Sequence, residues 1–433
     1  MKTAIVGGGA AGFFLAVNLK EMVPEMDVCI FERGQRVLRK VELSGGGRCN
    51  CTNSFEHVAD LSEVYPRGHR LMKRLFNVFD HRDAYAWFER HGVHLVTQDD
   101  ACVFPASQDA HTITGCFLDE AHRLGTSIRT GSAIESLSQL RDYDFIAVTT
   151  GGCPKIHTPH STLHPSHSTL HTSPSTLHTS PSTLHPSPST LHTSPTWPLL
   201  EEAGVELVEP VPSLFTFNIA DDQLRALMGI VSEATVMIPG TKMKAQGPLL
   251  ITHWGMSGPA ILRLSSYGAR LLHENHYRLP LAVNWTGLRP DEVLAEIQLT
   301  AATHPQKKPT SVRPFGLTGR LWEYLVGKSL GHRATTTWAA LSRKELNRLA
   351  NTLTNDEYQI AGRAPFKDEF VTCGGIALSS VNASTLESKS RPGLYFAGEV
   401  LDIDGVTGGF NFQAAWTTAY VVASSIARKC KPA

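Results

Sequence analysis

The first thirty-two residues alternate between short apolar runs and a glycine-rich turn. Residues 3–6 form a brief apolar run suited to a buried parallel strand, and residues 27–32 form a second one. Between them, residues 10–22 carry apolar side chains, Phe13 and Phe14 among them, in a pattern that favours a packed helix. The pattern predicts a strand–turn–helix–strand unit, which is typical of a parallel α/β sheet.

The alternation continues over the next hundred residues. Residues 70–92 carry a helical pattern rich in aromatic side chains, and residues 109–125 predict a further helix that ends at Gly125. Residues 144–152 then predict an apolar strand followed by a second glycine turn. We therefore expect a first α/β domain over residues 1–152.

The pattern is lost between residues 153 and 198. From Ser161 to Pro195 the unit S-T-L-H-[PT]-S-[PH] repeats five times at a seven-residue period. Each unit has one apolar residue, its leucine, and at least one proline, so it cannot form a coiled-coil stripe or offset its ordering entropy. We predict a disordered or extended linker whose histidines bind metal only adventitiously.

Apolar periodicity resumes beyond the linker. Residues 205–285 alternate short apolar strands with Gly and Pro turns, which favours a β-rich domain, whereas residues 290–355 favour helices. Residues 370–400 return to strands, and residues 410–429 predict one closing helix. The chain is therefore expected to leave its first domain and come back to it.

Composition narrows the functional classes. A chain of 433 residues, 42% hydrophobic and 18% charged, is typical of a globular protein with two or three domains. Forty Lys and Arg balance forty Asp and Glu, so the net charge gives no reason to expect nucleic acid or a membrane surface as a partner. The expected partner is a small-molecule substrate.

The cysteines and the N-terminal stretch indicate the compartment. The eight cysteines include no C-x-x-C pair, which fits reduced thiols in a reducing compartment. Cys49 and Cys51 form only a C-x-C pair, and we expect no metal site there. Glycines at 7–9 interrupt the apolar N-terminal stretch, and no run of eighteen apolar residues follows, so we expect a cytoplasmic protein.

The first turn is a G-x-G-x-x-G motif, GGGAAG, at residues 7–12. Gly7 permits the tight turn, Gly9 lets the backbone approach a pyrophosphate, and Gly12 allows close packing of the helix on the strand. Glu32 lies twenty residues beyond Gly12, where its carboxylate can accept the ribose hydroxyls and would repel a 2′-phosphate. The motif predicts a dinucleotide site, disfavours NADP, and leaves FAD and NAD open.

A second glycine-rich segment, RKVELSGGGRCNCTN, covers residues 39–53. It is polar and lightly basic, and its backbone N–H groups are suited to surround a phosphate or an isoalloxazine ring. A surface loop is the alternative that these residues leave open.

Four motifs stand out when the chain is taken together. They are GGGAAGFF at 7–14, RKVELSGGGRCNCTN at 39–53, THWGMSGPAILRLS at 252–265 and GLYFAGEVLDIDGVTGGFNFQAAW at 393–416. In these motifs the chain resembles the BaiN/YhiN-type bacterial flavoproteins, over nearly its whole length except 153–198. The resemblance implies that the dinucleotide is FAD.

The resemblance also implies the fold class, which is α/β with a Rossmann-like FAD-binding domain interrupted by a β-barrel-like domain and a small helical domain. The expected segments are 1–152 (FAD-binding domain, first part), 153–198 (linker), 199–285 (barrel-like domain), 286–358 (helical domain) and 359–433 (return through the barrel edge to the FAD-binding domain).

The matched motifs imply the residues that hold the cofactor, from both ends of the chain. We expect Asp402 and Asp404 to bond ribityl hydroxyls, and the helix from Phe410 to direct its N-terminus at the flavin, where it would favour negative charge. The full set of expected contacts is Gly7, Gly9, Ala10, Ala11, Gly12, Glu32, Arg33, Lys40, Ser44, Gly45, Gly46, Gly47, Arg48, Cys49, Asn50, Thr150, Gly151, Gly398, Glu399, Asp402, Gly408, Gly409, Asn411 and Phe412.

The implied activity is that of an FAD-dependent oxidoreductase. Hydride would pass between a small organic substrate and flavin N5, and oxygen, transiently bound NAD(P)H or another partner would complete the cycle. Some relatives are described as amine oxidases acting on aminoacetone, others as reductases of unsaturated bile-acid intermediates. Arg48 and His253 are the candidate catalytic residues. Two alternatives are a non-catalytic flavin-binding sensor or scaffold, and a flavin-dependent RNA-modifying enzyme, which the neutral charge disfavours.

The chain departs from the family in two places. The turn at 150–152 runs into the heptad repeat, which we interpret as an expansion within a surface connection. Between Ile134 and Asp144 there is little room for the β-meander that relatives carry, which puts the local sheet in doubt.

Overall fold

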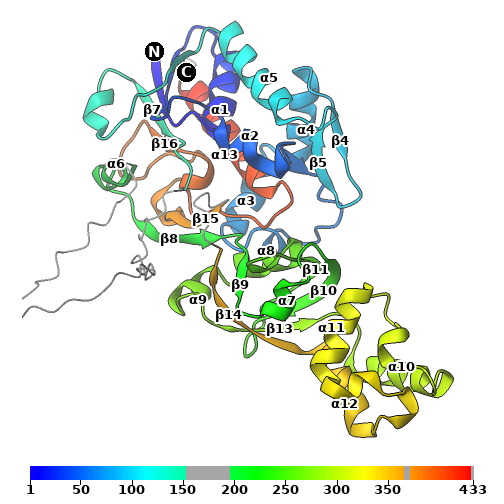
Figure 1. The fold of residues 1–433 in the computed structure, drawn as a ribbon. Coiled ribbons are helices and arrows are strands. Elements are labelled where there is room, and N and C mark those ends of the chain that lie inside the picture. The colour runs from blue at the N-terminus through cyan, green and yellow to red at the C-terminus, as the bar shows by residue number, and fades with distance from the viewer. Residues whose placement is uncertain (153–195, 365–370, 431–433) are drawn as a thin grey trace, which may run out of the picture.

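The computed structural model describes residues 1–152, 196–364 and 371–430. The heptad repeat therefore lies outside the described residues. Figure 1 shows three parts in a row, in which an α/β domain holds both chain ends, a barrel follows it, and a helical domain lies at the far end. This arrangement confirms the expected fold class.

A five-stranded parallel sheet forms the centre of the first domain. Its order is β16 (Leu394–Phe396), β7 (Phe145–Val148), β1 (Lys2–Val6), β2 (Asp27–Phe31) and β6 (Ser127–Arg129). Every neighbouring pair is parallel, and the inner strands are almost continuously apolar because helices cover them. The strand β16 comes from the C-terminal part of the chain, so the sheet itself joins the two ends.

Helix α1 (Ala10–Met22) is buried along most of its length because it packs against the closing helix α13 (Phe410–Cys430). The ring centroid of Phe14 lies 4.6 Å from that of Trp87 and 5.1 Å from that of Trp416. These aromatic side chains from three distant segments form the core of the domain. Burial of this kind is the main stabilising term available to the fold.

The aromatic-rich pattern at 70–92 forms two helices rather than one. They are α3 (His69–Leu75) and α4 (His81–Arg90), and Asp80 caps the second by accepting from the backbone N–H groups of Arg82 and Asp83. The remaining elements of this domain are α2 (Arg39–Leu43), η1 (Ser44–Gly46), η2 (Leu61–Glu63), α5 (Ala110–Arg123), η3 (Leu137–Leu140), and a small sheet of β3 (Thr52–Asn53), β5 (Cys102–Pro105) and β4 (Leu95–Thr97).

The short connection between residues 134 and 144 contains only η3, and no strand of a meander is present among these residues. The sheet is nevertheless regular on both sides of it, because β7 pairs with β1 and with β16. The doubt that the short segment raised about this sheet is therefore removed.

A closed six-stranded barrel forms the second part. Its order is β10 (Val231–Met237), β11 (Lys244–Ile251), β12 (Gly255–Ser257), β9 (Phe217–Ile219), β14 (Asp356–Arg363) and β13 (Pro280–Asn284). Beside it lie α7 (Asp222–Arg225), α8 (Pro259–Tyr267), α9 (Ala269–Glu274) and the antiparallel pair β8 (Leu207–Ser213) with β15 (Val371–Ile376). The short helix α6 (Thr196–Glu202) packs instead on the first domain, whose core includes Leu199 and Leu200 (Figure 1). The chain re-enters the barrel through β14 before it returns to the first domain, through η7 (Leu378–Ser380) and η8 (Gly398–Val400).

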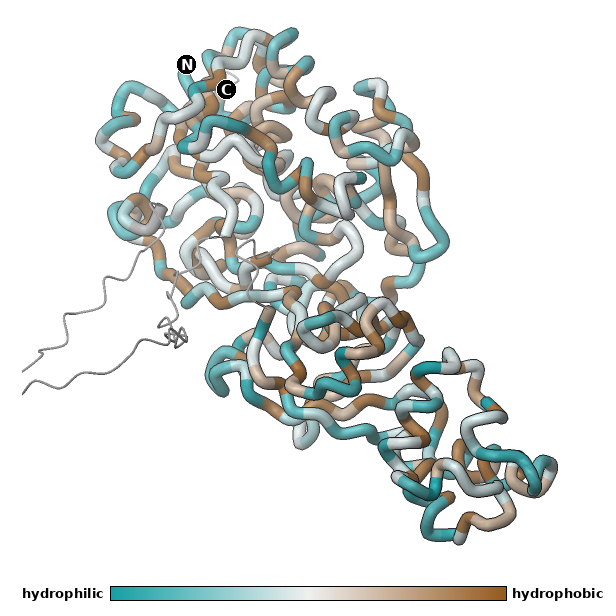
Figure 2. Tube along the Cα trace, viewed as in Figure 1, coloured by the Kyte–Doolittle hydropathy of each residue, from teal (hydrophilic) through white to brown (hydrophobic). Residues whose placement is uncertain are grey.

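The helical domain is inserted between β13 and β14. It consists of α10 (Pro290–Thr303), η4 (Pro309–Ser311), α11 (Gly319–Leu330), η5 (Gly331–Thr335), η6 (Trp338–Ala340) and α12 (Arg343–Thr354). Figure 2 shows hydrophobic and hydrophilic stretches alternating along these helices, and Trp322 and Trp338 are buried between them. None of the helices in the described residues combines the length and apolarity that crossing a membrane requires.

Candidate functional site

The turn after β1 has the geometry that its glycines require. Gly7 has a φ of +119°, and a Cβ placed on Gly12 would lie 2.1 Å from the carbonyl oxygen of Gly7. Thr149 Oγ1, at the end of β7, donates to the same carbonyl over 2.9 Å. Helix α1 starts at Ala10 with no side-chain cap at Gly9, so its first N–H groups are available to an anion.

Glu32 lies directly beside this turn, just beyond β2. Its carboxylate oxygens accept from the backbone N–H groups of Gly8 at 2.9 Å and Gly34 at 2.7 Å. These bonds orient the carboxylate and leave lone pairs on both oxygens for a ribose. Arg33 follows it on the exposed side of the turn.

The second glycine-rich segment lies against the C-terminal motif. Trp416 Nε1 donates to the Cys51 carbonyl at 2.7 Å, and the hydroxyl of Thr52 donates to Gln413 Oε1 at 2.6 Å. A Cβ on Gly409 would lie 2.1 Å from the carbonyl oxygen of Thr52, so only glycine permits this approach. The predicted contact between the two ends of the chain is therefore present, and the cofactor site that they would form stays a prediction.

Lys40 and Glu399 link the same two segments by an ion pair of 2.7 Å. Glu399 also accepts from the backbone N–H of Thr372 at 2.8 Å. Burial opposes its charged form, yet the Lys40 ammonium and the backbone donors hold the pKa of Glu399 below its ordinary value. Both carboxylate oxygens are thus used by the protein, and Glu399 positions the loops around the site.

The residues present fit a bound dinucleotide. A Cβ placed on Gly9, Gly46 or Gly47 meets no atom within 4 Å, so these backbone segments border open space. Thr150 Oγ1 and Asp402 Oδ1 are buried without a hydrogen-bond partner among the described residues. Open glycine backbone and unsatisfied polar atoms suit the phosphates and hydroxyls of such a ligand.

Arg67 and Asp404 form a buried ion pair behind this region. Arg67 Nε donates to Asp404 Oδ1 at 2.5 Å, Nη2 donates to Oδ2, and Ser213 Oγ donates to Oδ2 at 3.2 Å. Burial opposes the charge of Arg67, but the adjacent carboxylate raises the pKa of the guanidinium overall. The expectation that Asp404 bonds ribityl hydroxyls is wrong, because its side chain is 0% exposed and its oxygens bond Arg67 and Ser213.

Arg67 also connects the domains, because its Nη1 donates to the Ser266 carbonyl of α8 at 2.7 Å. Two further arginines of the barrel part approach the first domain. Arg270 Nη2 lies 4.0 Å from Asp402 Oδ1, and Arg263 lies close enough to Cys102 to oppose the burial that raises the pKa of that thiol to about 11. The sequence patterns did not identify Arg67 or Arg270 as residues of the site, because both contact residues that are distant in the sequence. Arg263 lies within the motif at 252–265 but carries no signal of its own.

The candidate catalytic residues have ordinary surroundings. Arg48 donates to the carbonyl of Gly45 at 3.1 Å and covers the ring of Phe104 at 4.3 Å, so it holds its own loop. His253 is exposed in the hairpin between β11 and β12 and packs beside Trp254. Among the described residues, neither side chain contacts the first turn or the C-terminal motif.

The other predicted contacts support the loops that they belong to. Asn411 pairs with both backbone groups of Gly405, at 2.8 and 2.9 Å, and Phe412 stacks on Trp416. Ser44 Oγ donates to the Val41 carbonyl at 2.8 Å. Burial raises the pKa of Cys49 to about 12, so its thiol stays protonated. The role of each predicted residue toward a cofactor stays a prediction.

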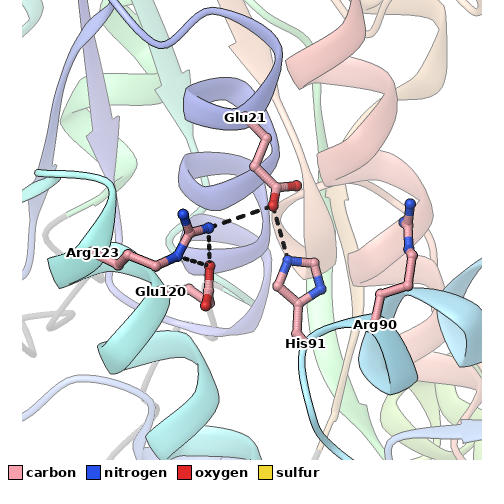
Figure 3. A pocket seen from close by; sticks show the side chains of 5 residues that line it. All are labelled: Glu21, Arg90, His91, Glu120 and Arg123. Atoms are coloured by element: carbon pink, nitrogen blue, oxygen red, sulfur yellow. Dashed lines mark hydrogen bonds and ion pairs between the residues drawn. The ribbon is translucent and has the colours of Figure 1, made fainter.

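A separate polar depression of about 390 Å³ lies where α1, α4 and α5 end (Figure 3). Oxygens of Glu21 and Glu120 and a ring nitrogen of His91 lie within 4.8 Å of one another, which is the geometry of a metal site. However, the guanidinium of Arg123 bonds Glu120 and lies 3.9 Å from Glu21, and His91 bonds Glu21 at 2.9 Å. We interpret the cluster as an ion-pair network that joins three helices.

Both partners of the His91–Glu21 pair have shifted pKa values. Burial alone would lower the pKa of His91, but its hydrogen bonds to Glu21 and to the Trp87 carbonyl raise it overall. The hydrogen bond from His91 lowers the pKa of Glu21. The pair is therefore favoured in its charged form over a window of mildly acidic pH.

The sequence matches two family models and several characterised relatives. A family model described as "HI0933-like protein Rossmann domain" matches residues 1–158, and one described as "HI0933-like protein barrel and H2TH domain" matches residues 211–371. The chain is 29% identical to a ribosomal RNA dihydrouridine synthase of Escherichia coli (strain K12), over 98% of this chain and 97% of that protein.

Two further relatives match over almost their whole length. One is a ribosomal RNA dihydrouridine synthase of Haemophilus influenzae, 26% identical over 98% of both chains. The other is a 3-dehydro-bile acid delta(4,6)-reductase of Clostridium scindens, 24% identical over 99% of both chains.

Proposed function

The chain belongs to the HI0933-like family of FAD-dependent oxidoreductases, and from this premise we propose that it reduces a carbon–carbon double bond conjugated to a carbonyl group. The first substrate that we propose is uracil in ribosomal RNA, which would become dihydrouracil. The observation that carries the proposal is the contact of the second glycine-rich segment with the C-terminal motif, together with the glycine backbone at Gly9, Gly46 and Gly47 that borders open space.

The names of the relatives support this reaction type. A dihydrouridine synthase adds two hydrogens across the double bond of a uracil ring, which is conjugated to a ring carbonyl. A delta(4,6)-reductase of a 3-dehydro bile acid acts on double bonds conjugated to the 3-keto group. The two substrates differ greatly in size and polarity, but the bond that is reduced is of the same kind.

The residues of this chain have separable roles in such a reaction. Gly7, Gly9 and the start of α1 would hold the pyrophosphate, and Glu32 the adenosine ribose. Thr150 and Asp402 would satisfy their free oxygens on the rest of the cofactor. Once reduced by a two-electron donor, bound FAD would supply the hydride for one carbon of the double bond, and the other carbon would take a proton.

Arg263 and Arg270 are the groups that we assign to the substrate carbonyl. Negative charge develops on that oxygen when hydride adds to the conjugated carbon, and a preorganised cation stabilises it. Arg263 Nε and Arg270 Nη2 are buried without a hydrogen-bond partner among the described residues, and Arg270 faces Asp402. Both come from the barrel part, so the site would be assembled where that part contacts the first domain.

The electrons have to be supplied from outside the described site. The sequence has one G-x-G-x-x-G in a strand–turn–helix setting, and we assign it to FAD. Transiently bound NAD(P)H is the donor that we propose.

The test uses the purified holoprotein and ribosomal RNA from a strain that lacks the corresponding gene. We expect anaerobic incubation with NADPH to add two hydrogens to a uridine, detected by mass spectrometry of the nucleosides. Arg270→Lys should lower kcat and keep the flavin, whereas Arg289→Lys, on the exposed surface of the helical domain, should change neither. Flavin that NADPH does not reduce, or reduced flavin that no substrate reoxidises, would contradict the proposal.

A second substrate class is favoured by the relative from Clostridium. A 3-keto steroid with conjugated double bonds is the probe for that class. Reoxidation of the reduced protein by the steroid, without dihydrouridine in the RNA, would assign the chain to small-molecule reduction.

A further inference from the structure

The neutral net charge of the chain hides a strong asymmetry. Residues 304–348 contain nine Lys and Arg but only two Asp and Glu, which is a net charge of +7. The other 388 residues contain thirty-one basic and thirty-eight acidic ones, a net charge of −7. The neutral total, which disfavours nucleic acid for the chain as a whole, therefore does not describe the charge of this segment.

The basic segment forms most of the helical domain, from the loop after α10 to the second turn of α12 (Figure 1). Only two of its nine cations are paired with described carboxylates. Lys328 bonds Asp356 at 2.6 Å, and Arg333 bonds Glu345 at 3.1 Å. The other seven are exposed and have no carboxylate of the described chain within ion-pair distance; these are Lys307, Lys308, Arg313, Arg320, Arg343, Lys344 and Arg348. We call them the basic helical surface.

Backbone contacts bring two parts of this surface together. Trp338 N donates to the Lys307 carbonyl and Ala339 N to the Pro305 carbonyl, both at 2.9 Å. The loop with Lys307 therefore lies against η6, which leads within three residues to Arg343 and Lys344 at the start of α12. The two basic pairs thus border the same end of the domain.

The stability of the helix does not explain this arrangement. Arg343 and Lys344 occupy the first two positions of α12, where a cation opposes the helix dipole. The first turn is stabilised instead by Ser342 and Glu345, whose side chains form a capping box. An anionic partner would compensate the unfavourable cations.

We infer that the basic helical surface binds the phosphodiester backbone of the RNA whose uridine is reduced; this inference rests on the proposed function. Exposed Lys and Arg without a carboxylate partner are the groups that neutralise phosphates, and such contacts fix the position of a nucleic acid without reading its sequence. A membrane surface fits less well, because no large apolar side chain of residues 304–348 is exposed for insertion. The helical domain anchors the RNA, and the first domain and barrel act on the base.

The first experiment compares two double variants that remove equal charge. Arg343→Ala/Lys344→Ala removes cations from the proposed surface, and Lys242→Ala/Lys244→Ala removes two exposed cations from the barrel hairpin. Fluorescence anisotropy of a labelled RNA hairpin with a uridine-rich loop measures binding by the holoprotein over a range of salt. The first variant should bind at least about tenfold more weakly, and the slope of log K against log salt should fall by about 2, while the control keeps the wild-type values.

A second pair of measurements separates this inference from the proposed function. The variant should retain full flavin content and full NADPH-dependent flavin reduction, and its turnover of RNA should show a raised KM with kcat unchanged. Lys307→Ala/Lys308→Ala changes a loop and leaves α12 intact. This variant should also lose RNA binding, which would show that the loss in Arg343→Ala/Lys344→Ala is not caused by unfolding of α12. If the protein reduces no uridine but the variants still lose RNA binding, the result supports the RNA-binding surface and contradicts the proposed substrate.

Three results would overturn the inference. One is equal RNA affinity and salt slope in the wild type, the surface variants and the control. Another is loss of affinity in the control that matches the loss in the surface variants. The third is binding of phosphatidylglycerol vesicles, lost in the surface variants, by a protein that does not bind the RNA hairpin.

Discussion

The ion pair of Arg67 with Asp404 joins three parts of the chain, and Asp404→Asn tests how strongly it stabilises them. The Asp404 side chain is 0% exposed and the Arg67 side chain 16% exposed. Arg67 belongs to the first part of the α/β domain and Asp404 to its C-terminal part, while Ser213 and Ser266 bring β8 and α8 to the same two side chains. The substitution keeps the shape of the side chain and removes its charge.

The expected loss is large because a buried cation remains unpaired. Removing one member of a buried pair destabilises by about 3–5 kcal/mol. For a unit of this size each kcal/mol lowers Tm by about 2–4 °C, so Asp404→Asn should melt roughly 6–20 °C below the wild type. Asp291→Asn is the control, because Asp291 pairs with Arg289 at 3.2 Å on the surface and is 70% exposed, and it should cost less than about 0.5 kcal/mol.

Thermal unfolding followed by circular dichroism and by the release of bound flavin measures both effects. Arg67→Met/Asp404→Leu removes both charges and should regain part of the lost stability. Equal melting temperatures of Asp404→Asn and Asp291→Asn would refute the reasoning, as would a double variant less stable than Asp404→Asn alone.

Three other predictions concern separate parts of the chain. Gly409→Ala places a Cβ 2.1 Å from the Thr52 carbonyl oxygen and should abolish flavin retention, measured by absorbance per folded chain, whereas full retention would show that the two segments can move apart. The pKa of His91 is raised, so its charged form stabilises the fold below its ordinary pKa of about 6.5, and this stabilisation is lost as the pH rises through the raised pKa. The pKa of Glu21 is lowered, so its charged form stabilises the fold above about pH 4.5. His91→Gln should therefore lower Tm more at about pH 6 than at about pH 9, and an equal loss of Tm at both pH values would contradict the charged pair. Deletion of residues 158–194 should leave flavin content and solubility unchanged, and a colourless or insoluble product would contradict the linker interpretation.

The parts of the fold that could be predicted are those with local signals. The run at 3–6, the glycines at 7–12 and the helix that follows are contiguous, so strand, turn and helix follow from spacing alone. The break between α3 and α4 was not evident, because an aromatic-rich pattern continues across it, although Asp80 carries the signal of a helix start.

The parts that could not be predicted depend on contacts between distant residues. A closed barrel requires β14 to pair with β9 and β13 across the whole helical insertion, and no strand pattern shows which edges meet. Asp404 has the residue type of a ribityl contact, but only the fold shows that Arg67, over three hundred positions away, occupies it. The charge of residues 304–348 was visible in the sequence, but the total over the chain concealed it.

The central claim is that the turn at Gly7 and the segment at Gly409 enclose one molecule of FAD. The most direct measurement is the ratio of FAD to folded chain, determined by chromatography after acid release, in the wild type and in Gly9→Val. We predict one FAD per wild-type chain and its loss in the variant, because valine would fill the open space beside the first turn. A folded wild-type chain that retains no FAD when incubated with excess cofactor, or a Gly9→Val chain that retains all of it, would contradict the claim.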